Sequence, residues 1–312
     1  MDRFDAMQAF VRVVEVGSFS GAAERLGVTK SVVSRRVADL ERALGAELLR
    51  RTTRRLHLTD SGRAYYERAR RILADLAEAE QAVSSEQGAL RGELRVAAPL
   101  SFGIGPLQPA IEAFQERHPE VTFDLDLDDR QVDLVKEGVD VAVRIANLED
   151  STLVARRLAP IRGIVCASPD YLARHGTPET PEQLAAHPAL VYTNRQQPEV
   201  WPYTDPSGRA GRVRVTPRLR ANNGDFLREA ALAGQGVLYS PLFILHRALE
   251  EDRLVPILAD YRWPEVAAYA VYPRTRHLSA RVRAFVDFLA ERFAGAPYWE
   301  RAVRGDAGAR RP

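Results

Sequence analysis

The sequence predicts an α/β protein in three parts: an N-terminal winged helix-turn-helix, a long linker helix and a C-terminal domain of two α/β lobes. Three observations predict this arrangement. Single glycines separate short helical patterns that lead into an arginine-rich hairpin, apolar residues then recur in heptads, and strand and helix patterns alternate through the remainder. The length of 312 residues agrees with it, because a chain of this size builds about two cores.

The composition is that of a globular protein and excludes several classes of protein. Hydrophobic residues make up 46% and charged residues 28%, which excludes a disordered or fibrous chain. The formal net charge of +2 allows a polyanionic partner without requiring one. Cys166 is the single cysteine, so neither a disulfide within the chain nor a cysteine-based metal site is available. The sequence shows no signal peptide and no apolar run of membrane-spanning length, so we expect a cytoplasmic protein without a membrane partner.

Three short helices are predicted at the N-terminus. The first follows from apolar residues spaced three and four apart, which are Phe4, Met7, Val11 and Val14. Gly17 ends this helix, and Ser18 is placed to cap a second one over residues 19–26. Gly27 then turns the chain, and Thr29 is placed to cap the third helix. Helices joined by a glycine turn in this way are typical of a helix-turn-helix.

The third helix is predicted to have an apolar face and a polar face. The apolar face, directed to the core, carries Val33, Val37, Leu40 and Leu44. The polar face carries Lys30, Ser31, Val32, Ser34, Arg35 and Arg36. Residues 48–58 follow as a hairpin with four arginines at its tip, which we interpret as the wing. Exposed arginines are usually only solvated, but their grouping at a helix start beside a basic wing favours duplex DNA.

The residues predicted to contact DNA come from the first capped turns, the third helix and the wing. They are Ser18, Ser20, Thr29, Lys30, Ser31, Val32, Ser34, Arg35, Arg36, Arg50, Arg51, Thr53 and Arg54. In such an interface arginine and lysine bind phosphates, and a few side chains read base edges. The N-terminal domain is predicted to span residues 1–59.

A linker helix is predicted to begin near Asp60 and to run to about residue 87, within a linker of residues 60–91. Its apolar residues are spaced alternately four and three apart: Tyr65, Ala69, Ile72, Leu76, Ala79 and Val83. This heptad spacing predicts pairing with a second copy of the helix, and therefore a homodimer. The alternative is a core helix of the following domain, but the highly charged opposite face favours the dimer.

The C-terminal domain is predicted to span residues 92–297. Alternation over residues 94–98 and 121–127, with a helix between them, implies a parallel sheet. The chain is predicted to enter a second lobe near residues 161–167 and to return near residue 268. The first lobe then comprises residues 92–161 and 268–297, and the second comprises residues 162–267. Residues 298–312 are predicted to be a disordered tail.

Residues 10–66 strongly resemble the LysR type of transcriptional regulator. The matching segments are SFSGAAERLG (18–27), VVSRRV (32–37), LE (40–41), LG (44–45), LLRR (48–51) and TDSG (59–62). The resemblance continues in PLSFG (99–103), DLV (133–135), DVAVRI (140–145), LVARRL (153–158), CASP (166–169), YLARHG (171–176), NNG (222–224) and HLS (277–279). Lys30 and Ser31 depart from the residues common in the family, which bears on operator preference and not on the fold.

The resemblance implies a ligand-responsive, DNA-binding regulator. The effector domain would be similar to the two lobes of periplasmic binding proteins, with the effector between them. The oligomer would be a homotetramer built as two dimers, and a two-fold dimer implies a pseudo-palindromic operator on double-stranded DNA. RNA polymerase is a further candidate partner.

The candidate effector site lies at two junctions between a strand and a helix. Ser101 stands at one of them, and Asn222, Asn223 and Gly224 stand at the other. The simplest interpretation of the asparagines is an ordinary helix cap, but two helix N-termini that face one crevice would bind an anion. Phe102 would supply an apolar wall and Arg144 a positive charge. The site would then suit a small organic carboxylate.

Two other classes of function compete with a regulator. A solute-binding protein would share the two lobes but not the winged helix. An enzyme with a DNA-binding appendage would need catalytic residues that the sequence does not reveal. The glycines at residues 103–105 and 234–236 do not form a dinucleotide-binding fingerprint, and the six histidines lack metal-ligand spacing. We therefore expect no catalytic residues, no metal and no cofactor.

Overall fold

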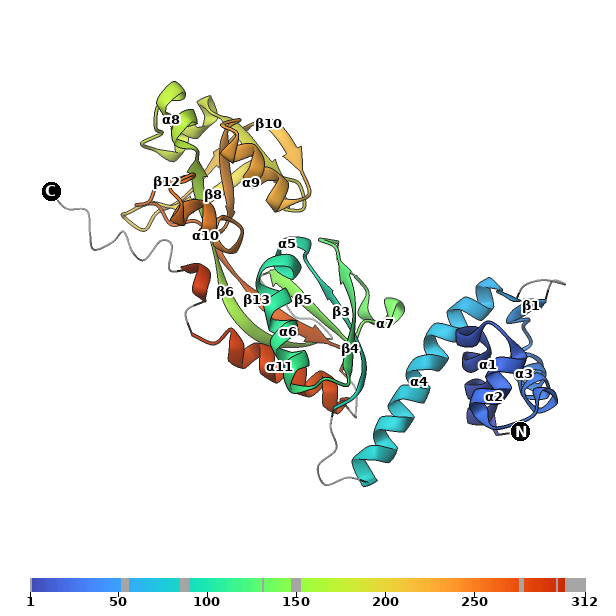
Figure 1. The fold of residues 1–312 in the computed structure, drawn as a ribbon. Helices are drawn as coiled ribbons and strands as arrows, with labels where there is room; N and C mark the ends of the chain where they lie inside the picture. The colour runs from blue at the N-terminus through green and yellow to red at the C-terminus, as the bar shows by residue number, and fades with distance from the viewer. Residues whose placement is uncertain are drawn as a thin grey trace. The chain divides into compact units, whose positions relative to one another are not determined.

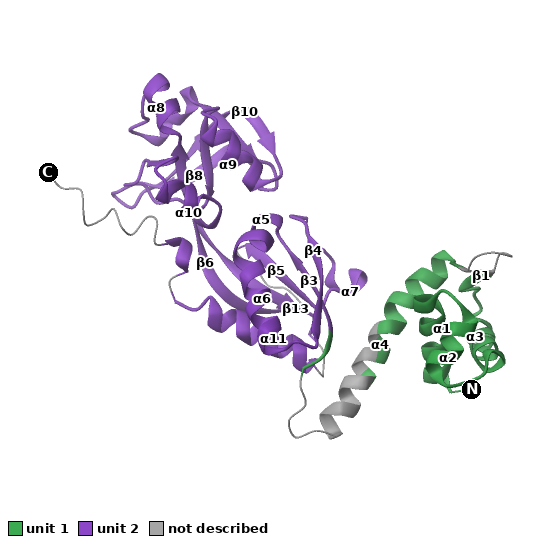
Figure 2. Cartoon of the chain, viewed as in Figure 1, with its two compact units in different colours: residues 1–92 green, residues 93–312 purple. Residues whose placement is uncertain are grey.

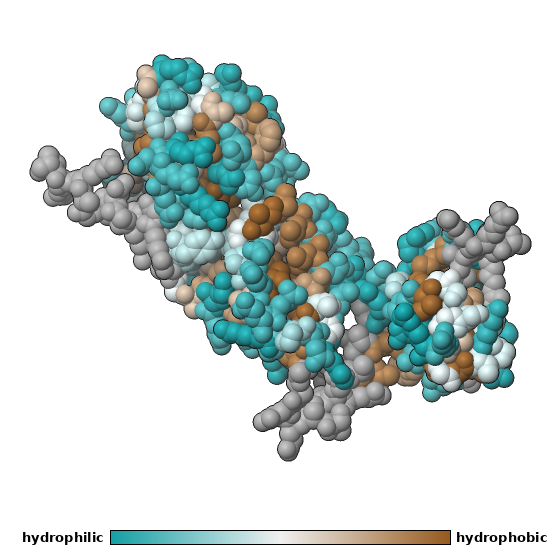
Figure 3. Space-filling model, viewed as in Figure 1, coloured by the Kyte–Doolittle hydropathy of each residue, from teal (hydrophilic) through white to brown (hydrophobic). Residues whose placement is uncertain are grey.

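The structure is a computed structural model that describes residues 2–51, 56–84, 90–130, 132–146, 153–274, 278–295 and 297–300. The chain divides into two compact units, Met1–Gly92 and Glu93–Pro312 (Figure 2). Hydrophilic residues cover most of the face shown in Figure 3, with apolar patches between them. Within the described part, no helix combines the length and the apolar character that a membrane span requires.

The first unit is a winged helix-turn-helix followed by a long helix (Figure 1). Its elements are α1 (Arg3–Val16), α2 (Phe19–Leu26), α3 (Lys30–Leu44), β1 (Leu49–Arg51), β2 (Leu56–Leu58) and α4 (Asp60–Ser84). Gly17 and Gly27 have φ values of 72° and 65°, which allow them to end α1 and α2. Ser18 caps α2 by accepting a hydrogen bond from the Gly21 amide at 3.1 Å. The predicted turns and this cap are confirmed.

The core of the first unit lies between α1, α3 and the start of α4. Phe10, Val33, Leu40 and Leu48 are fully buried in it. The prediction that Leu44 faces this core is wrong, because its side chain is 38% exposed. Leu44 is the last residue of α3, and the chain turns away directly after it.

The second unit contains two lobes that share one long strand. Lobe I holds β3 (Gly92–Ala98), α5 (Leu100–Phe102), a π-helical turn (Gly103–Leu107), α6 (Gln108–Arg117), β4 (Val121–Leu127), α7 (Leu134–Glu137), β5 (Val141–Ala146), β13 (Glu265–Tyr272) and α11 (Ala280–Arg292). The strands lie in the order β4, β3, β5, β13, β6, and β3 and β5 are parallel. The sheet is mixed because β13 runs antiparallel to β5 and β6. Phe114 of α6 and Phe285 of α11 pack on each other over this sheet.

Lobe II is built around a second part of the same sheet. Its elements are α8 (Pro169–His175), a 3-10 helix (Pro181–Ala186), β7 (Pro188–Tyr192), β8 (Val200–Thr204), β9 (Ala210–Arg214), β10 (Thr216–Ala221), α9 (Gly224–Leu232), β11 (Val237–Pro241), α10 (Leu242–Glu250) and β12 (Val255–Ile257). Strand β7 lies parallel to both β10 and β11. Strands β8 and β9 form a separate antiparallel hairpin.

Strand β6 (Val154–Ala167) passes from one lobe to the other. Arg162 is its last residue paired with β13 of lobe I, opposite Glu265. Gly163 is its first residue paired with lobe II, opposite Pro241 of β11. The strand pairing therefore changes between two consecutive residues.

The end of the described chain corrects one prediction. Residues 298–312 are predicted to be disordered, but Tyr298–Glu300 form a 3-10 helix. Trp299 within it is fully buried, and burying so large an aromatic side chain favours an ordered segment. Residues 301–312 lie outside the described part.

Candidate DNA-binding face and effector site

Helix α3 presents a polar face away from the core of the first unit. Lys30, Ser31 and Arg35 are exposed on this face, and Val32, Ser34 and Arg36 are partly buried. Thr29 occupies the cap position but makes no side-chain capping bond, so its predicted role is wrong in that respect. Its hydroxyl lies 2.9 Å from that of Ser31 instead. Both hydroxyls stand at the N-terminus of α3, where the helix dipole favours an anion such as phosphate.

The two neighbouring arginines of α3 differ in their surroundings. Arg36 forms an ion pair and a hydrogen bond with Asp5 of α1. Arg35 makes no ion pair with any residue that the structure describes. Arg36 therefore ties α3 to α1, while the charge of Arg35 remains available to a partner.

The base of the wing is held by a residue whose role the sequence does not reveal. Glu41 of α3 accepts hydrogen bonds from the amides of Leu48 and Leu49, at 2.8 and 3.1 Å. This contact fixes the first wing strand against the end of α3. A glutamate within a helix gives no sequence signal of such a contact, because its partners lie beyond the end of that helix.

The other predicted DNA-contacting residues are only partly described. Ser18 is occupied by its cap, Ser20 is exposed, and Arg50 is exposed with its guanidinium 3.3 Å from the carboxylate of Glu47. The side chain of Arg51, and Thr53 and Arg54 at the wing tip, lie outside the described part.

The regularly spaced apolar residues of α4 lie in two different environments, the first of them in the core of the unit and a later one at the surface. The ring of Tyr65 lies 5.7 Å from that of Phe10 in α1, and Ala69 is fully buried in the same core. Ile72, one step further along the seam, is 45% exposed. The start of the predicted dimer seam is therefore used inside its own unit, and the exposed seam begins at Ile72. The side chains of Ala79 and Val83 lie outside the described part.

The two junctions predicted to form the effector site do come together. A Cβ atom on Gly224 of lobe II would lie 3.6 Å from the hydroxyl of Ser101 in lobe I. It would also lie 2.5 Å from Cδ1 of Ile244, so a larger residue at position 224 would require the end of the Ile244 side chain to move. The Ser101 hydroxyl is buried and has no hydrogen-bond partner among the described residues. A buried hydroxyl without a partner is unfavourable and is a natural contact for a ligand.

Asp129, which was not among the predicted site residues, joins the two lobes beside Ser101. Its Oδ1 accepts a hydrogen bond from the Leu100 amide at 2.9 Å, and its Oδ2 accepts one from the hydroxyl of Tyr192 at 2.5 Å. Burial and this hydrogen bond raise the pKa of the Tyr192 phenol well above its usual value. We call Ser101, Asp129, Tyr192, Gly224 and Ile244 the inter-lobe junction.

Asp129 changes the expected electrostatics of the site. The N-terminus of the helix at Leu100 was predicted to be open to an anion, but the Asp129 carboxylate already occupies it. A signal for this residue exists in the sequence, because it follows the strand of residues 121–127 and sheets place ligand-binding residues after the ends of their strands.

The remaining predicted effector residues differ in their contacts and exposure. Asn223 caps α9 by accepting a hydrogen bond from the Phe226 amide at 2.8 Å, which is the simpler of the two interpretations, and Asn222 is exposed. Arg144 donates a hydrogen bond to the Val132 carbonyl at 2.9 Å. Phe102 is fully buried among the rings of Phe243, Phe293 and Trp299, and its role as a wall of the effector site stays a prediction.

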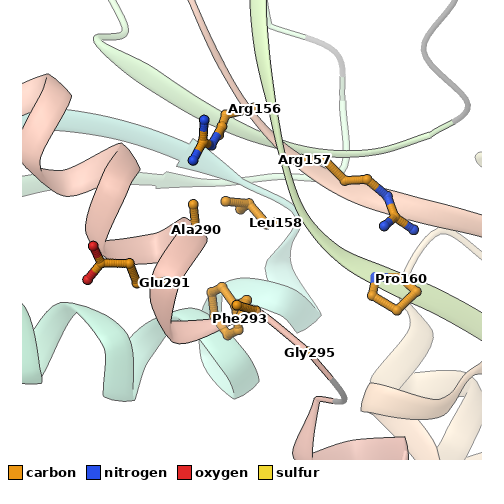
Figure 4. Close-up of a pocket in the computed structure, with 9 residues that line it drawn as sticks. Arg156, Arg157, Leu158, Pro160, Ala290, Glu291, Phe293 and Gly295 are labelled. Carbon is orange, nitrogen blue, oxygen red and sulfur yellow. The ribbon is translucent and has the colours of Figure 1, made fainter.

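A cavity of about 510 Å³ lies along lobe I, and none of the predicted effector residues lines it (Figure 4). It is lined by Arg156, Arg157, Leu158 and Pro160 of β6 and by Ala290, Glu291, Phe293, Ala294 and Gly295 at the end of α11. The guanidinium groups of Arg156 and Arg157 point in different directions in Figure 4, and Arg157 is 4.0 Å from Glu265. The two charges therefore do not converge on one anion.

The described residues contain no group of three or more histidine, cysteine, aspartate or glutamate side chains that could hold a metal ion. Cys166 is fully buried on β6, and burial raises the pKa of its thiol to about 12. A thiol with such a pKa stays protonated and is a poor nucleophile.

Comparisons with known proteins match both units. Residues 4–63 match the bacterial regulatory helix-turn-helix of the lysR family, and residues 87–294 match the LysR substrate binding domain. The regulator CrgA of Neisseria meningitidis serogroup C is 38% identical over 288 residues, covering 92% of this chain and 96% of that protein. The solved structure of CrgA superimposes with a TM-score of 0.61 at 37% identity, over 93% of this chain and 99% of that one. The full-length Vibrio cholerae virulence activator AphB has a TM-score of 0.59 at 28% identity, over 93% and 99% of the two chains.

Proposed function

The chain belongs to the LysR family of transcriptional regulators, and we propose that it binds a specific operator under the control of a small organic carboxylate. A solute-binding protein and an enzyme are the alternatives. The relatives named above are transcriptional regulators, and a winged helix-turn-helix has no use in a solute-binding protein. The observation that carries the effector proposal is the buried hydroxyl of Ser101 where the two lobes meet, which has no hydrogen-bond partner in the described part of the chain.

The proposed DNA contacts centre on the exposed start of α3. Lys30, Ser31 and Arg35 would enter the major groove, because they stand at the N-terminal end of the second helix of the motif. The wing would bind the neighbouring phosphates through Arg50, Arg51, Thr53 and Arg54. The ion pair with Asp5 assigns Arg36 mainly to holding α3 in place. Binding to chromosomal DNA places the protein in the cytoplasm.

The proposed oligomer is a homodimer formed through α4, with a homotetramer as two such dimers. The exposed Ile72 and the partly buried Leu76 are the described seam residues beyond the core of the first unit. A two-fold dimer would bind a pseudo-palindromic operator with half-sites an integral number of helical turns apart. Contact with RNA polymerase would follow if the bound protein activates transcription.

The proposed effector contacts both lobes at the inter-lobe junction. The Ser101 hydroxyl would donate to a carboxylate oxygen, and the first amides of α9 would supply further donors, because a helix leaves its first amides without partners inside the helix. The negative charge of Asp129 disfavours a second carboxylate at Leu100. The acid group is therefore expected on the α9 side of the junction, near Gly224.

An effector that touches both lobes favours the arrangement of the lobes in which it binds more tightly. It must bind that arrangement with higher affinity than the others, because equal affinity would shift nothing. The change in the lobes would then alter how the two DNA-binding units of a dimer fit the operator.

The test combines a ligand screen with DNA binding. A thermal-shift screen of small carboxylates, each paired with its amide, identifies ligands that stabilise the folded chain. A mobility-shift assay on the DNA upstream of the gene is then run with and without each ligand found. Stabilisation by acids and not by their amides, with a change in DNA affinity, supports the proposal. Binding to this DNA that no carboxylate alters would contradict the effector proposal, and absence of DNA binding would contradict the regulator.

A further inference from the structure

The described chain ends in a short segment that lies beyond the family match, which stops at residue 294. This segment, residues 297–300, follows α11 and contains the 3-10 helix Tyr298–Glu300. We call it the C-terminal strap. Its side chains contact elements of both lobes.

Trp299 of the strap fills a space between the lobes. Its side chain is fully buried, and its ring lies 6.3 Å from that of Phe102 in lobe I and 6.2 Å from that of Phe243 in lobe II. The ring of Phe293, at the end of α11, lies 6.0 Å away on a third side. The rings of Phe102 and Phe243 also contact each other at 5.5 Å. One aromatic cluster therefore joins α5, α10 and the strap.

Glu300 of the strap reaches the point where β6 changes lobes. Its side chain is almost fully buried, and Oε2 lies 3.0 Å from Nη2 of Arg162. Arg162 is the last residue of β6 paired in lobe I, directly before the first residue paired in lobe II. A carboxylate so far removed from water is strongly unfavourable without a partner of opposite charge, so the pair fixes the strap at this point.

Tyr298 adds a contact to lobe II. Its ring lies 5.3 Å from that of His246 in α10, in an edge-to-face arrangement. The strap therefore leaves lobe I at the end of α11 and packs along α10 of lobe II. It is a third crossing between the lobes, in addition to β6 and the segment that leads into β13.

We propose that the C-terminal strap fixes the arrangement of the two lobes and thereby sets the geometry of the inter-lobe junction. Phe102, which Trp299 contacts, directly follows Ser101 in the sequence. Phe243, which Trp299 also contacts, directly precedes Ile244, the residue packed over Gly224. Trp299 and Glu300 are positioning residues, since they act through these neighbours and touch no ligand. This inference concerns the lobes themselves and does not depend on the identity of the effector.

A simpler role for the strap is a plug that only stabilises the core beneath it. The two roles predict different results for the distance between the lobes. A plug raises the free energy of unfolding without changing how the lobes are arranged. A strap that fixes the lobes also controls the distance between them in the folded chain.

The distance is measured by double electron-electron resonance on the full chain. Spin labels are attached at Glu116→Cys on α6 and Glu179→Cys in lobe II, both of which are exposed sites. The native Cys166 is fully buried and takes no label, which a chain without the two added cysteines verifies. Labelled chains are mixed with excess unlabelled chains, so that only distances within one chain contribute.

Two truncations form the central comparison. A chain that ends at Glu300 keeps the strap and loses only residues 301–312. We expect its distance distribution to match that of the whole chain. A chain that ends at Gly295 loses the strap, and we expect a displaced mean or a second population. Trp299→Ala should act in the same direction, and Trp299→Phe should restore most of the original distribution, because an aromatic ring is kept in the cluster.

Glu300→Gln tests the ion pair and guards against a chain that fails to fold. The amide keeps the shape of the side chain but removes its charge, and circular dichroism verifies that the variant is folded. We expect a broader distance distribution than in the whole chain. If Glu300→Gln and Trp299→Ala are folded and both give the distribution of the whole chain, the strap is only a plug and the proposal is overturned.

Discussion

Glu41, Gly62 and Asp129 each contact the backbone of another element of the fold. Glu41 and Asp129 accept hydrogen bonds from backbone amides at the start of β1 and at Leu100. Gly62 of α4 lies against Leu48, where a Cβ atom would stand 2.0 Å from the carbonyl oxygen. The sequence does not predict these three contacts, because in each case the partner is a backbone group that tertiary folding brings close. For Asp129 its place after a strand indicates a candidate site residue but not its partner.

Gly62→Ala is predicted to destabilise the first unit by about 1–3 kcal/mol, because the added methyl meets backbone and no flexible side chain can move away. All three tryptophans lie in the second unit. Urea unfolding followed by far-ultraviolet circular dichroism should therefore show an earlier first transition, while tryptophan fluorescence should be unchanged. Gly105→Ala is the control, because a Cβ atom there has no neighbour within 4 Å. Equal effects of the two substitutions on the dichroism transition would refute the steric explanation.

Arg35→Ala and Arg36→Ala are predicted to have different consequences. Arg35 has no ion-pair partner among the described residues, so its removal should weaken operator binding by about 1–3 kcal/mol if it contacts a base. Arg36 pairs with Asp5, so its removal should mainly lower stability, by about 0.2–1 kcal/mol for a pair exposed to this extent. Fluorescence anisotropy on labelled operator DNA measures the first effect, and urea unfolding the second. An equal loss of operator affinity in both variants would show that the ion pair does not separate their roles.

The elements were predictable wherever one period continued without interruption. The glycine turns at residues 17 and 27 follow from local preference, and the strands of residues 94–98 and 121–127 follow from alternation. Errors arose where a period reached the end of an element, as at the exposed Leu44, or where a pattern could not say which partner it faces. Phe102 illustrates the second limit, since an aromatic residue beside Ser101 suits a ligand site and a core equally well, and the structure shows only that its ring is buried.

The heptad seam of α4 shows the same limit at the scale of one helix. Spacing alone assigns Tyr65 and Ile72 to one surface, but Tyr65 packs on Phe10 within its own unit and Ile72 is exposed. The heptad period correctly predicts an apolar stripe along α4. It does not specify where the stripe stops packing on its own unit and becomes available to another chain.

Ile72→Glu is predicted to weaken self-association through α4. In a two-fold dimer the substitution places two like charges close to the seam, where they are unpaired and partly removed from water. Leu76→Glu should have the same effect one turn later. Ala64→Glu is the control, because it adds the same charge to an exposed site on the same helix. Sedimentation velocity should show smaller species for the first two variants only, and an unchanged oligomer in both would exclude this seam as the dimer surface.

At the scale of the whole molecule, the second unit combines one unsatisfied buried group with several contacts between its lobes. The Ser101 hydroxyl is buried without a partner among the described residues, whereas Asp129 and Tyr192 form a hydrogen bond between the lobes at 2.5 Å. The strap adds the Trp299 cluster and the pair of Glu300 with Arg162. The stability that these contacts supply can offset the free-energy cost of leaving the Ser101 hydroxyl unsatisfied, and a bound ligand would remove that cost.

Ser101→Ala is predicted to remove most of the effector's influence on DNA binding while leaving the DNA affinity of the free protein intact. The hydroxyl has no described partner to lose, so the substitution should not destabilise the second unit. A hydrogen bond to a charged carboxylate contributes about 1.5–3 kcal/mol, so calorimetry should show effector binding weakened by about 10- to 100-fold.

Ser279→Ala is the matched control for this prediction, because its hydroxyl is also buried without a described partner but lies at the start of α11, outside the inter-lobe junction. Gly224→Ala gives a second, independent perturbation, since its methyl would press on Ile244 and alter the junction without removing a donor. Both Ser101→Ala and Gly224→Ala should uncouple the effector from the operator, and Ser279→Ala should not. If the effector binds all three variants with the affinity of the parent chain, then its site lies elsewhere in the second unit, and the contact between Ser101 and Gly224 is a feature of packing alone.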